Sequence, residues 1–229
     1  MAHKSAYRVG EVEISVVRRG EPGDLPSLVL LPGTGLTAED WAVVADDLAR
    51  DRVVHAVDLR GHGRSGRPGR YSVDLMADDV RGLVTWLGAP VDLVGHSLGG
   101  LVACRVAAAA PGLVRGLVLE DVGLLRPREP APPQRPDGEL DLDWRVVEQV
   151  RPEIDSPAAH WPATLAAITA PTLVIGGGPR SFVPQDSITE LVDLLPDGRV
   201  TTLDTGHEVH AARPVEVADL VRAFLAGLA

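Results

Sequence analysis

Residues 91–100 read VDLVGHSLGG, and this stretch decides what kind of fold the chain adopts. Residues 91–94 form a short, mostly apolar run typical of a buried strand, and the Ala- and Val-rich residues 98–110 are typical of a helix. Between them, residues 95–99 fit the pattern G-x-S-x-G, in which a serine stands on a sharp turn from a strand into a helix. We therefore expect Ser97 on such a turn, with its side chain exposed above the end of the strand.

A serine on this kind of turn is a candidate nucleophile. The turn strains the serine backbone, and the flanking glycines are needed because a Cβ at either position would collide with the neighbouring strand or helix. The helix behind Ser97 also directs the positive end of its dipole toward the place where a negatively charged oxygen would form. The alternative is a serine that only caps the helix, and the strand before it favours the nucleophile.

Short β-rich runs alternate with longer helical patterns along the rest of the chain. This alternation predicts an α/β fold, with a mostly parallel central sheet and helices on both faces. The expected strands are 7–9 and 11–18, which form a hairpin at Gly10, then 27–31, 53–57, 91–95, 114–120, 172–176 and 199–203. The expected helices are 37–50 with Thr37 as N-cap, 72–87 capped by Ser72 or Asp74, 98–110, 184–195 and 214–228.

Residues 122–169 interrupt this alternation. Five prolines lie between residues 124 and 136, too many for a helix or a central strand. Helical patterns follow at 142–150 and 158–168, and the alternative for the proline tract alone is a disordered loop. We expect a core made of residues 1–121 and 170–229, with 122–169 inserted as a small helical lid. Trp144 and Trp161 are candidates to line a pocket beneath it or to anchor it, with Trp144 the pocket candidate.

Composition excludes several classes of partner. The chain has 229 residues, 45% of them hydrophobic, which suits one globular domain with a small insertion. Its formal net charge of −10 repels nucleic acid and anionic membranes at long range. With one cysteine, Cys104, no disulfide can form within the chain. We find no signal peptide or membrane-spanning stretch and expect a cytoplasmic protein with a small-molecule substrate; the oligomeric state is left open.

The pattern around Ser97 resembles that of the α/β-hydrolase superfamily, and the resemblance runs from about residue 27 to the C-terminus. Residues 31–35 (LPGTG) follow the expected third strand, where the family places one oxyanion-hole amide. Family members usually carry His-Gly there, whereas this chain has Pro-Gly. The resemblance implies an oxyanion hole made by the backbone N–H groups of Thr34 and Leu98. Residues 58–65 (DLRGHGRS) resemble the family's D-x-R-G-x-G-x-S loop, which makes His62 a structural residue.

A serine nucleophile needs a base, and imidazole has a suitable pKa. Gly206 and His207 follow the last expected strand, where the family places its catalytic histidine, so His207 is the expected base. His210 lies three residues further along and is a weaker candidate for that role; we expect it to line the pocket instead.

The acid that orients the base is harder to assign. The family's usual aspartate follows the strand 172–176, but Arg180 stands at that position. Some relatives, such as the haloalkane dehalogenases, place the acid one strand earlier, where this chain has Glu120 and Asp121. Successive strand residues face opposite ways, so only one of the two can reach the histidine. Alignment favours Asp121 over Glu120, and Asp186 and Asp204 are outside candidates.

These residues imply hydrolysis of an ester or thioester through an acyl-enzyme on Ser97. Cleavage of a lactone, or of a carbon–carbon bond in a diketone, uses the same residues and stays open. The nucleophile is a serine, which argues against dehalogenase and epoxide hydrolase chemistry because those relatives use an aspartate. No metal or other cofactor is expected. A non-catalytic ligand binder of the same fold is the alternative from another class, favoured slightly by Pro32 and Arg180.

Overall fold

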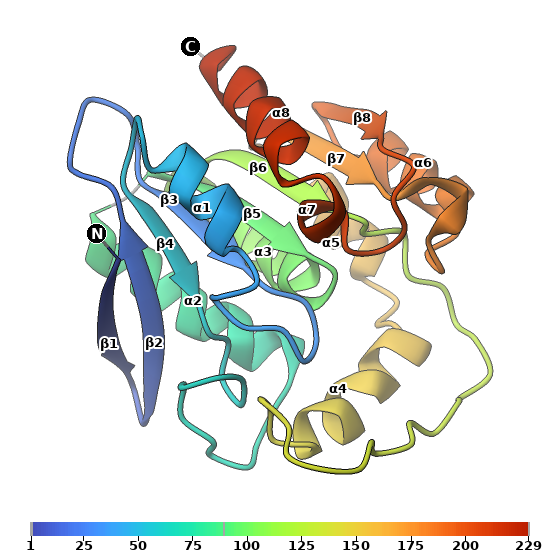
Figure 1. The fold of residues 1–229 in the computed structure, drawn as a ribbon. Coiled ribbons are helices and arrows are strands. Elements are labelled where there is room, and N and C mark those ends of the chain that lie inside the picture. Colours follow the sequence, from blue (N-terminus) through green and yellow to red (C-terminus); the bar gives the residue numbers. More distant parts are fainter. Residues whose placement is uncertain (1, 89, 229) are drawn as a thin grey trace.

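The computed structural model describes residues 2–88 and 90–228, which form one twisted sheet flanked by helices (Figure 1). The sheet has eight strands in the order β1-β2-β4-β3-β5-β6-β7-β8. β1 pairs antiparallel with β2 and β2 with β4, and the remaining pairs are parallel. The strands are β1 His3–Val9, β2 Val12–Arg19, β3 Leu28–Leu31, β4 Val54–Val57, β5 Val91–His96, β6 Val114–Glu120, β7 Thr172–Gly176 and β8 Gly198–Thr202. The predicted α/β fold with a mostly parallel sheet is confirmed.

Helices cover both faces of the sheet. α1 and α8 contact each other on one face, and α2 and α3 contact each other on the other (Figure 1). The α-helices are α1 Ala42–Leu48, α2 Val73–Leu87, α3 Leu98–Ala109, α4 Arg145–Asp155, α5 Trp161–Ala166, α6 Gln185–Leu194, α7 Val209–Ala212 and α8 Pro214–Ala226. None of the helices in the described part of the chain is long and apolar enough to cross a membrane.

Strand β3 shows why the central strands read as unbroken apolar runs. Leu28 and Leu30 face the hydrophobic cluster under α1 and α8, whereas Val29 and Leu31 face the cluster under α2 and α3. All four residues are completely buried. Because successive side chains point to opposite faces, a strand covered by helices on both sides needs apolar residues at every position.

The prediction for the first helix was wrong at its N-terminal end. α1 begins at Ala42 after Trp41, and Thr37 is not its cap. Instead, the Asp40 carboxylate accepts hydrogen bonds from the Thr37 backbone N–H (2.7 Å) and hydroxyl (3.0 Å). Such local side-chain bonds stabilise turns in competition with a helix, and residues 38–41 form turns. In α2, by contrast, the Ser72 hydroxyl accepts the Leu75 N–H at 3.0 Å and is the N-cap, as predicted.

Residues 122–169 lie between β6 and β7 and contain α4 and α5, which begin about three residues later than the sequence indicated. In Figure 1, α4 lies on the side toward which the central parallel strands point. The proline tract is an extended loop tied to α4, because the Arg128 N–H donates to the Asp155 carbonyl at 2.9 Å. Val146, Trp161 and Leu165 of this segment belong to the main hydrophobic cluster. The segment is thus packed on the core; its action as a lid stays a prediction.

Candidate active site

Ser97 stands where β5 passes into α3, as the sequence predicted. Its backbone has φ 49° and ψ −116°, a conformation that a residue with a Cβ adopts only under strain. Its N–H donates to the Glu120 carbonyl at 3.0 Å, which ties the turn to the end of β6. Ser97 stays partly exposed between buried neighbours on both sides. The fold therefore presents this hydroxyl at the carboxyl-terminal edge of the sheet.

Close packing explains the glycines on either side of Ser97. A Cβ on Gly95 would lie 2.4 Å from the carbonyl oxygen of Gly99. A Cβ on Gly99 would lie 2.4 Å from the carbonyl oxygen of Leu31 in β3. Both distances are far below van der Waals contact with backbone atoms that have no room to move, so α3 can reach the sheet only if these positions lack side chains.

The structure places Asp121, and not Glu120, beside His207. His207 lies in the loop between β8 and α7, and its Nδ1 is 2.7 Å from Asp121 Oδ2. The Asp121 side chain is 0% exposed and that of His207 is 18% exposed. An ionised carboxylate only accepts hydrogen bonds, so Nδ1 carries the proton in this pair and Nε2 is left as the basic nitrogen. Within the described residues Ser97 Oγ makes no hydrogen bond to His207; such bonds commonly tighten only when substrate binds.

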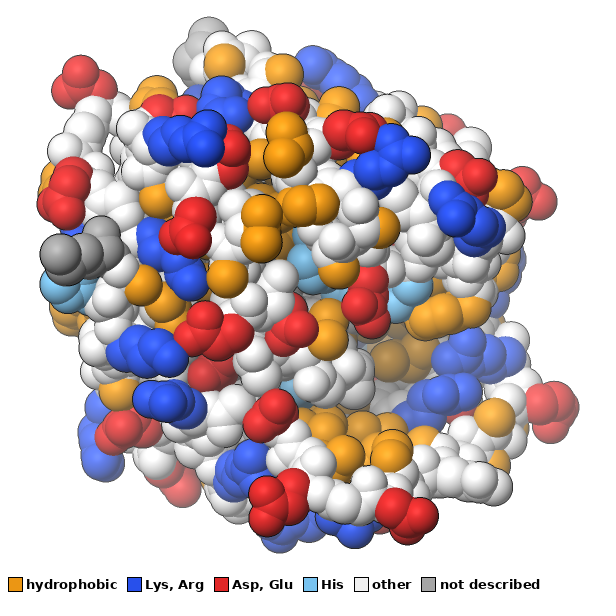
Figure 2. Space-filling view, in the orientation of Figure 1, with side chains coloured by type: hydrophobic (Ala, Val, Ile, Leu, Met, Phe, Trp, Pro, Cys, Tyr) orange, Lys and Arg blue, Asp and Glu red, His pale blue; other side chains and the backbone are white. Residues whose placement is uncertain are grey.

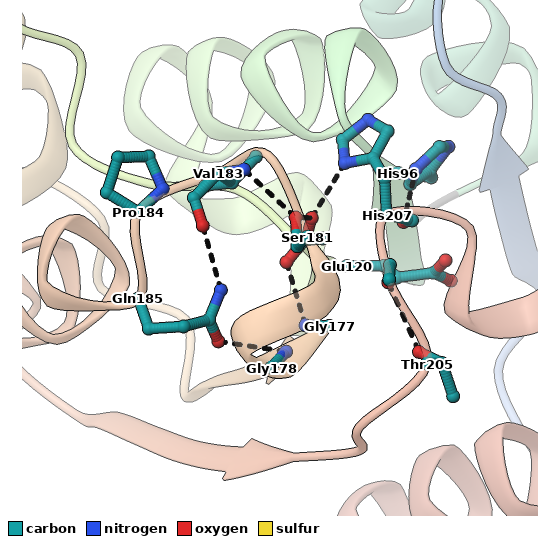
Figure 3. Close-up of polar contacts among 12 residues, drawn as sticks. His96, Glu120, Gly177, Gly178, Ser181, Val183, Pro184, Gln185, Thr205 and His207 are labelled. Carbon is teal, nitrogen blue, oxygen red and sulfur yellow. Dashed lines mark hydrogen bonds and ion pairs between the residues drawn. The ribbon is translucent and has the colours of Figure 1, made fainter.

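The loop that follows β7 supplies further donors to Asp121, and Figure 3 shows Gly177 and Ser181 of this loop on the side of His207. The Gly177 N–H donates to Oδ1 at 2.7 Å, and the Ser181 hydroxyl donates to Oδ2. Asp121 itself has a positive φ of 49°, which is rare for a residue other than glycine. Sequence reasoning missed Ser181, because only the folded loop shows that its hydroxyl reaches back to β6.

Arg180 turns away from this cluster. Its Nε is 2.9 Å from Asp204 Oδ1, and both side chains are more than 60% exposed. The Arg180 guanidinium thus pairs with a carboxylate at the surface, and the partner of Asp204 is Arg180 rather than His207. Asp186 lies in the first turn of α6.

Glu120 binds His210, the histidine three residues after His207. Its Oε1 accepts hydrogen bonds from His210 Nδ1 at 2.7 Å and from the His210 backbone N–H at 3.1 Å. Both side chains are 1% exposed, and the His210 ring stacks on Trp41 with 4.1 Å between ring centroids. Burial acts to raise the pKa of Glu120, but the hydrogen bond and charge of His210 outweigh it, and the pKa is lowered. His210 therefore lies in the interior and does not line an open pocket as the sequence suggested.

His96 links this buried pair to the loop of His207. Its Nε2 is 3.0 Å from the backbone carbonyl oxygen of His207 and donates to it. Burial lowers the pKa of His96 to about 4, so the ring is neutral at pH 7. His96, Glu120 and His210 have ligand-type atoms within 4.8 Å of one another, the one such group of three among the described residues. Because Glu120 and His210 already bond to each other, a metal ion there would have to displace that bond.

The two predicted oxyanion donors come from the turn after β3 and from the first residue of α3. Leu98 is the first residue of α3, so its N–H has no acceptor within the helix. Thr34 is exposed in the turn after β3. The preceding residue, Gly33, comes so close to the turn that a Cβ on it would lie 3.3 Å from Ser97 Cβ. The turn after β3 therefore packs against the Ser97 turn, and the role of Thr34 and Leu98 as oxyanion donors stays a prediction.

One apolar side chain contacts the His207 ring, and a separate cavity lies beside α3. Phe182 is 77% exposed, yet its ring centroid lies 4.1 Å from that of His207. A cavity of about 190 Å³ lies between α3 and the 122–169 segment, lined in part by Leu101, one turn after Ser97, and by Leu125 and Trp161. Figure 2 shows apolar side chains gathered in a hollow next to an exposed histidine. Trp144, the predicted pocket residue, precedes α4 and is half-buried; no aromatic contact joins it to His207 among the described residues.

Comparison with known proteins identifies the family of the chain. The model of the alpha/beta hydrolase family matches residues 28–220. A putative esterase/lipase of Haemophilus influenzae is 26% identical over 87% of this chain and 83% of its own length. A pimeloyl-[acyl-carrier protein] methyl ester esterase of Chromobacterium violaceum is 42% identical over 42% of this chain and 37% of its own length.

Solved structures show the same fold. The enol-lactonase of Burkholderia xenovorans superposes with a TM-score of 0.83 at 21% identity and covers 97% of this chain and 100% of its own. The thioesterase domain of the curacin biosynthetic pathway has a TM-score of 0.83 at 19% identity, over 97% of this chain and 99% of its own.

Proposed function

The chain belongs to the alpha/beta hydrolase family, and on this premise we propose that it is a serine hydrolase that cleaves an ester or thioester of a small to medium-sized organic molecule. In this proposal Ser97 is the nucleophile, His207 is the general base and Asp121 orients the imidazole. The observation that carries it is the 2.7 Å contact between His207 Nδ1 and the buried Asp121 carboxylate, at the edge of the sheet where Ser97 is exposed.

The proposed reaction has two halves. Ser97 Oγ attacks the carbonyl carbon while His207 Nε2 takes its proton, and the Thr34 and Leu98 N–H groups stabilise the oxyanion. His207 then gives that proton to the alcohol or thiol that leaves, and the acyl group stays on Ser97. A water molecule, deprotonated by His207, then attacks the acyl-enzyme. The bond between the acyl carbon and Ser97 Oγ breaks, His207 returns the proton to Ser97 Oγ, and the carboxylic acid is released. Asp121 keeps the Nδ1 proton in place throughout, so that Nε2 is the nitrogen that exchanges protons.

The comparisons support the class of substrate. Ester and thioester hydrolases occur among the similar proteins, which supports this class of substrate. A lactone is the second candidate, because an enol-lactonase shares the fold. The net charge of −10 argues against nucleic acid and anionic membranes as partners, and a cytoplasmic location stays a prediction from the sequence.

A panel of acyl-chain esters, thioesters and lactones tests the proposal. We expect the wild type to hydrolyse at least one class, and Ser97→Ala to lower kcat by about 10³-fold or more. Ser5→Ala, which removes an exposed hydroxyl from β1, is the matched control and should keep the wild-type rate. An acyl-enzyme also predicts a burst of the first product in rapid mixing. Binding of panel compounds without turnover by any of them would favour the ligand-binder alternative, and wild-type turnover by Ser97→Ala would exclude Ser97 as the nucleophile.

A further inference from the structure

The loop after β7 touches both partners of the His207–Asp121 pair. Ser181 donates its hydroxyl proton to Asp121 Oδ2, the same oxygen that His207 Nδ1 contacts. The Ser181 oxygen in turn accepts the Val183 N–H at 3.0 Å. Phe182, between these two residues, places its ring against the His207 imidazole. Two neighbouring residues of one loop therefore contact the acid and the base.

The hydrogen bonds of Asp121 leave it little freedom to rotate. Oδ1 accepts the Gly177 N–H, and Oδ2 accepts from Ser181 on one side and from His207 on the other. A carboxylate oxygen offers two lone pairs, so both directions on Oδ2 are filled. The side chain is 0% exposed, so no water replaces a lost donor cheaply. Without the Ser181 hydroxyl, Oδ2 would have one partner left, and only the Gly177 and His207 bonds would hold the carboxylate plane against the imidazole.

Phe182 is an apolar residue that is held in a solvent-exposed position. Its side chain is 77% exposed, although the Ser181–Val183 bond ties the backbone on both sides of it. The interplanar angle of 41° and the centroid separation of 4.1 Å put the ring over one face of His207. An exposed aromatic ring in contact with the base offers apolar surface to a molecule that binds next to it.

We propose that Ser181 is a positioning residue that fixes Asp121 for His207, and that Phe182 forms an apolar wall of the substrate site. This inference rests on the proposed function, since it assigns roles within the same site. Ser181 acts on the rate through Asp121 and His207. Phe182 acts on binding, through contact with the apolar part of the substrate.

The serine is tested by Ser181→Ala and Ser181→Thr, with Ser187→Ala as the matched control. The Ser187 hydroxyl donates to the Pro184 carbonyl at 2.6 Å and does not contact Asp121. We expect Ser181→Ala to lower kcat by about 10- to 100-fold with KM nearly unchanged, because misplacement of a catalytic group costs rate rather than binding. Ser181→Thr keeps the hydroxyl on an extended backbone (φ −76°, ψ 147°) and should restore kcat to within a few-fold. A kcat for Ser181→Ala within twofold of wild type would overturn the role of Ser181.

Proton NMR of the imidazole separates this inference from the function itself. The Nδ1–H of His207, bonded to a carboxylate, gives a far-downfield resonance that is expected in wild type, Ser181→Thr and Ser187→Ala. In Ser181→Ala the resonance should shift upfield or broaden as the carboxylate turns. Because this signal needs no turnover, it reports on Ser181 even if no substrate is hydrolysed. An unchanged resonance in Ser181→Ala would refute the positioning role and leave the proposed function standing.

Phe182 is tested by Phe182→Ala and Phe182→Tyr across a series of acyl-chain lengths. Phe182→Ala should raise KM by about tenfold for the longer apolar chains and leave it nearly unchanged for acetyl esters, whereas Phe182→Tyr should resemble wild type. A KM for Phe182→Ala equal to that of wild type at every chain length would refute the substrate contact.

Discussion

Replacement of Asp121 by asparagine tests the site through the geometry of one carboxylate. Both oxygens of Asp121 accept hydrogen bonds, Oδ1 from Gly177 and Oδ2 from Ser181 and His207. An amide has one acceptor and one donor end. If its NH₂ faces His207, the imidazole must carry its proton on Nε2 and cannot accept one from Ser97. If its NH₂ faces Gly177, a buried N–H loses its acceptor, at a cost of about 1–3 kcal/mol.

In either orientation Asp121→Asn also removes the negative charge that stabilises the imidazolium. We expect kcat to fall by about 10³- to 10⁴-fold, equivalent to about 4–5.5 kcal/mol of transition-state stabilisation. The assay is steady-state hydrolysis of the best ester from the panel, with thermal unfolding to show that the variant is folded. Asp204→Asn is the matched control, because its exposed pair with Arg180 should contribute little to stability or rate. A folded Asp121→Asn with kcat within tenfold of wild type would refute Asp121 as the orienting acid.

Three further predictions concern the scaffold around the site. Glu120→Ala leaves the buried His210 without its carboxylate partner and should lower the free energy of unfolding by about 3–5 kcal/mol, measured by urea titration. A loss below about 1 kcal/mol would contradict the buried pair. Burial, helped by the charge of Arg18, lowers the pKa of His55 from 6.5 to about 4. The unfolded chain therefore binds more protons than the folded one between pH 6.5 and 4, and the free energy of unfolding should fall over this range by up to about 3 kcal/mol from this residue. His55→Leu should weaken this pH dependence in melts at a series of pH values. The same pH dependence in wild type and His55→Leu would contradict the buried, neutral His55. Gly99→Ala should prevent α3 from packing on β3 and give a protein that melts well below wild type or fails to fold, and an unchanged melting temperature would contradict the close contact with the Leu31 carbonyl.

The sequence predicted the fold and the position of Ser97 because both depend on local patterns. Apolar runs marked the central strands, and G-x-S-x-G marked the turn. The beginning of α1 was misplaced because the Asp40 carboxylate bonds back to Thr37, and such a bond is visible only in the folded turn. Boundaries of this kind depend on competition between side-chain and helical hydrogen bonds.

Alternation along β6 left Glu120 and Asp121 as alternatives, and the structure shows that the two residues hold different histidines. Glu120 faces His210 in the interior, and Asp121 faces His207 at the edge of the sheet. The sequence placed His210 in the pocket because spacing alone does not say which way each residue of a turn points. Ser181 and Phe182 had no sequence pattern at all, since their contacts depend on how the loop after β7 folds back over β6.

Covalent labelling at Ser97 tests the central claim most directly. A fluorophosphonate reacts only with a serine whose hydroxyl is activated by a base in a formed oxyanion hole, and intact-mass measurement counts the adducts. We expect one adduct per chain on the wild type, located to the peptide that contains Ser97, and none on Ser97→Ala. A wild-type protein that stays unlabelled, or a Ser97→Ala variant that labels as fast as wild type, would contradict the account.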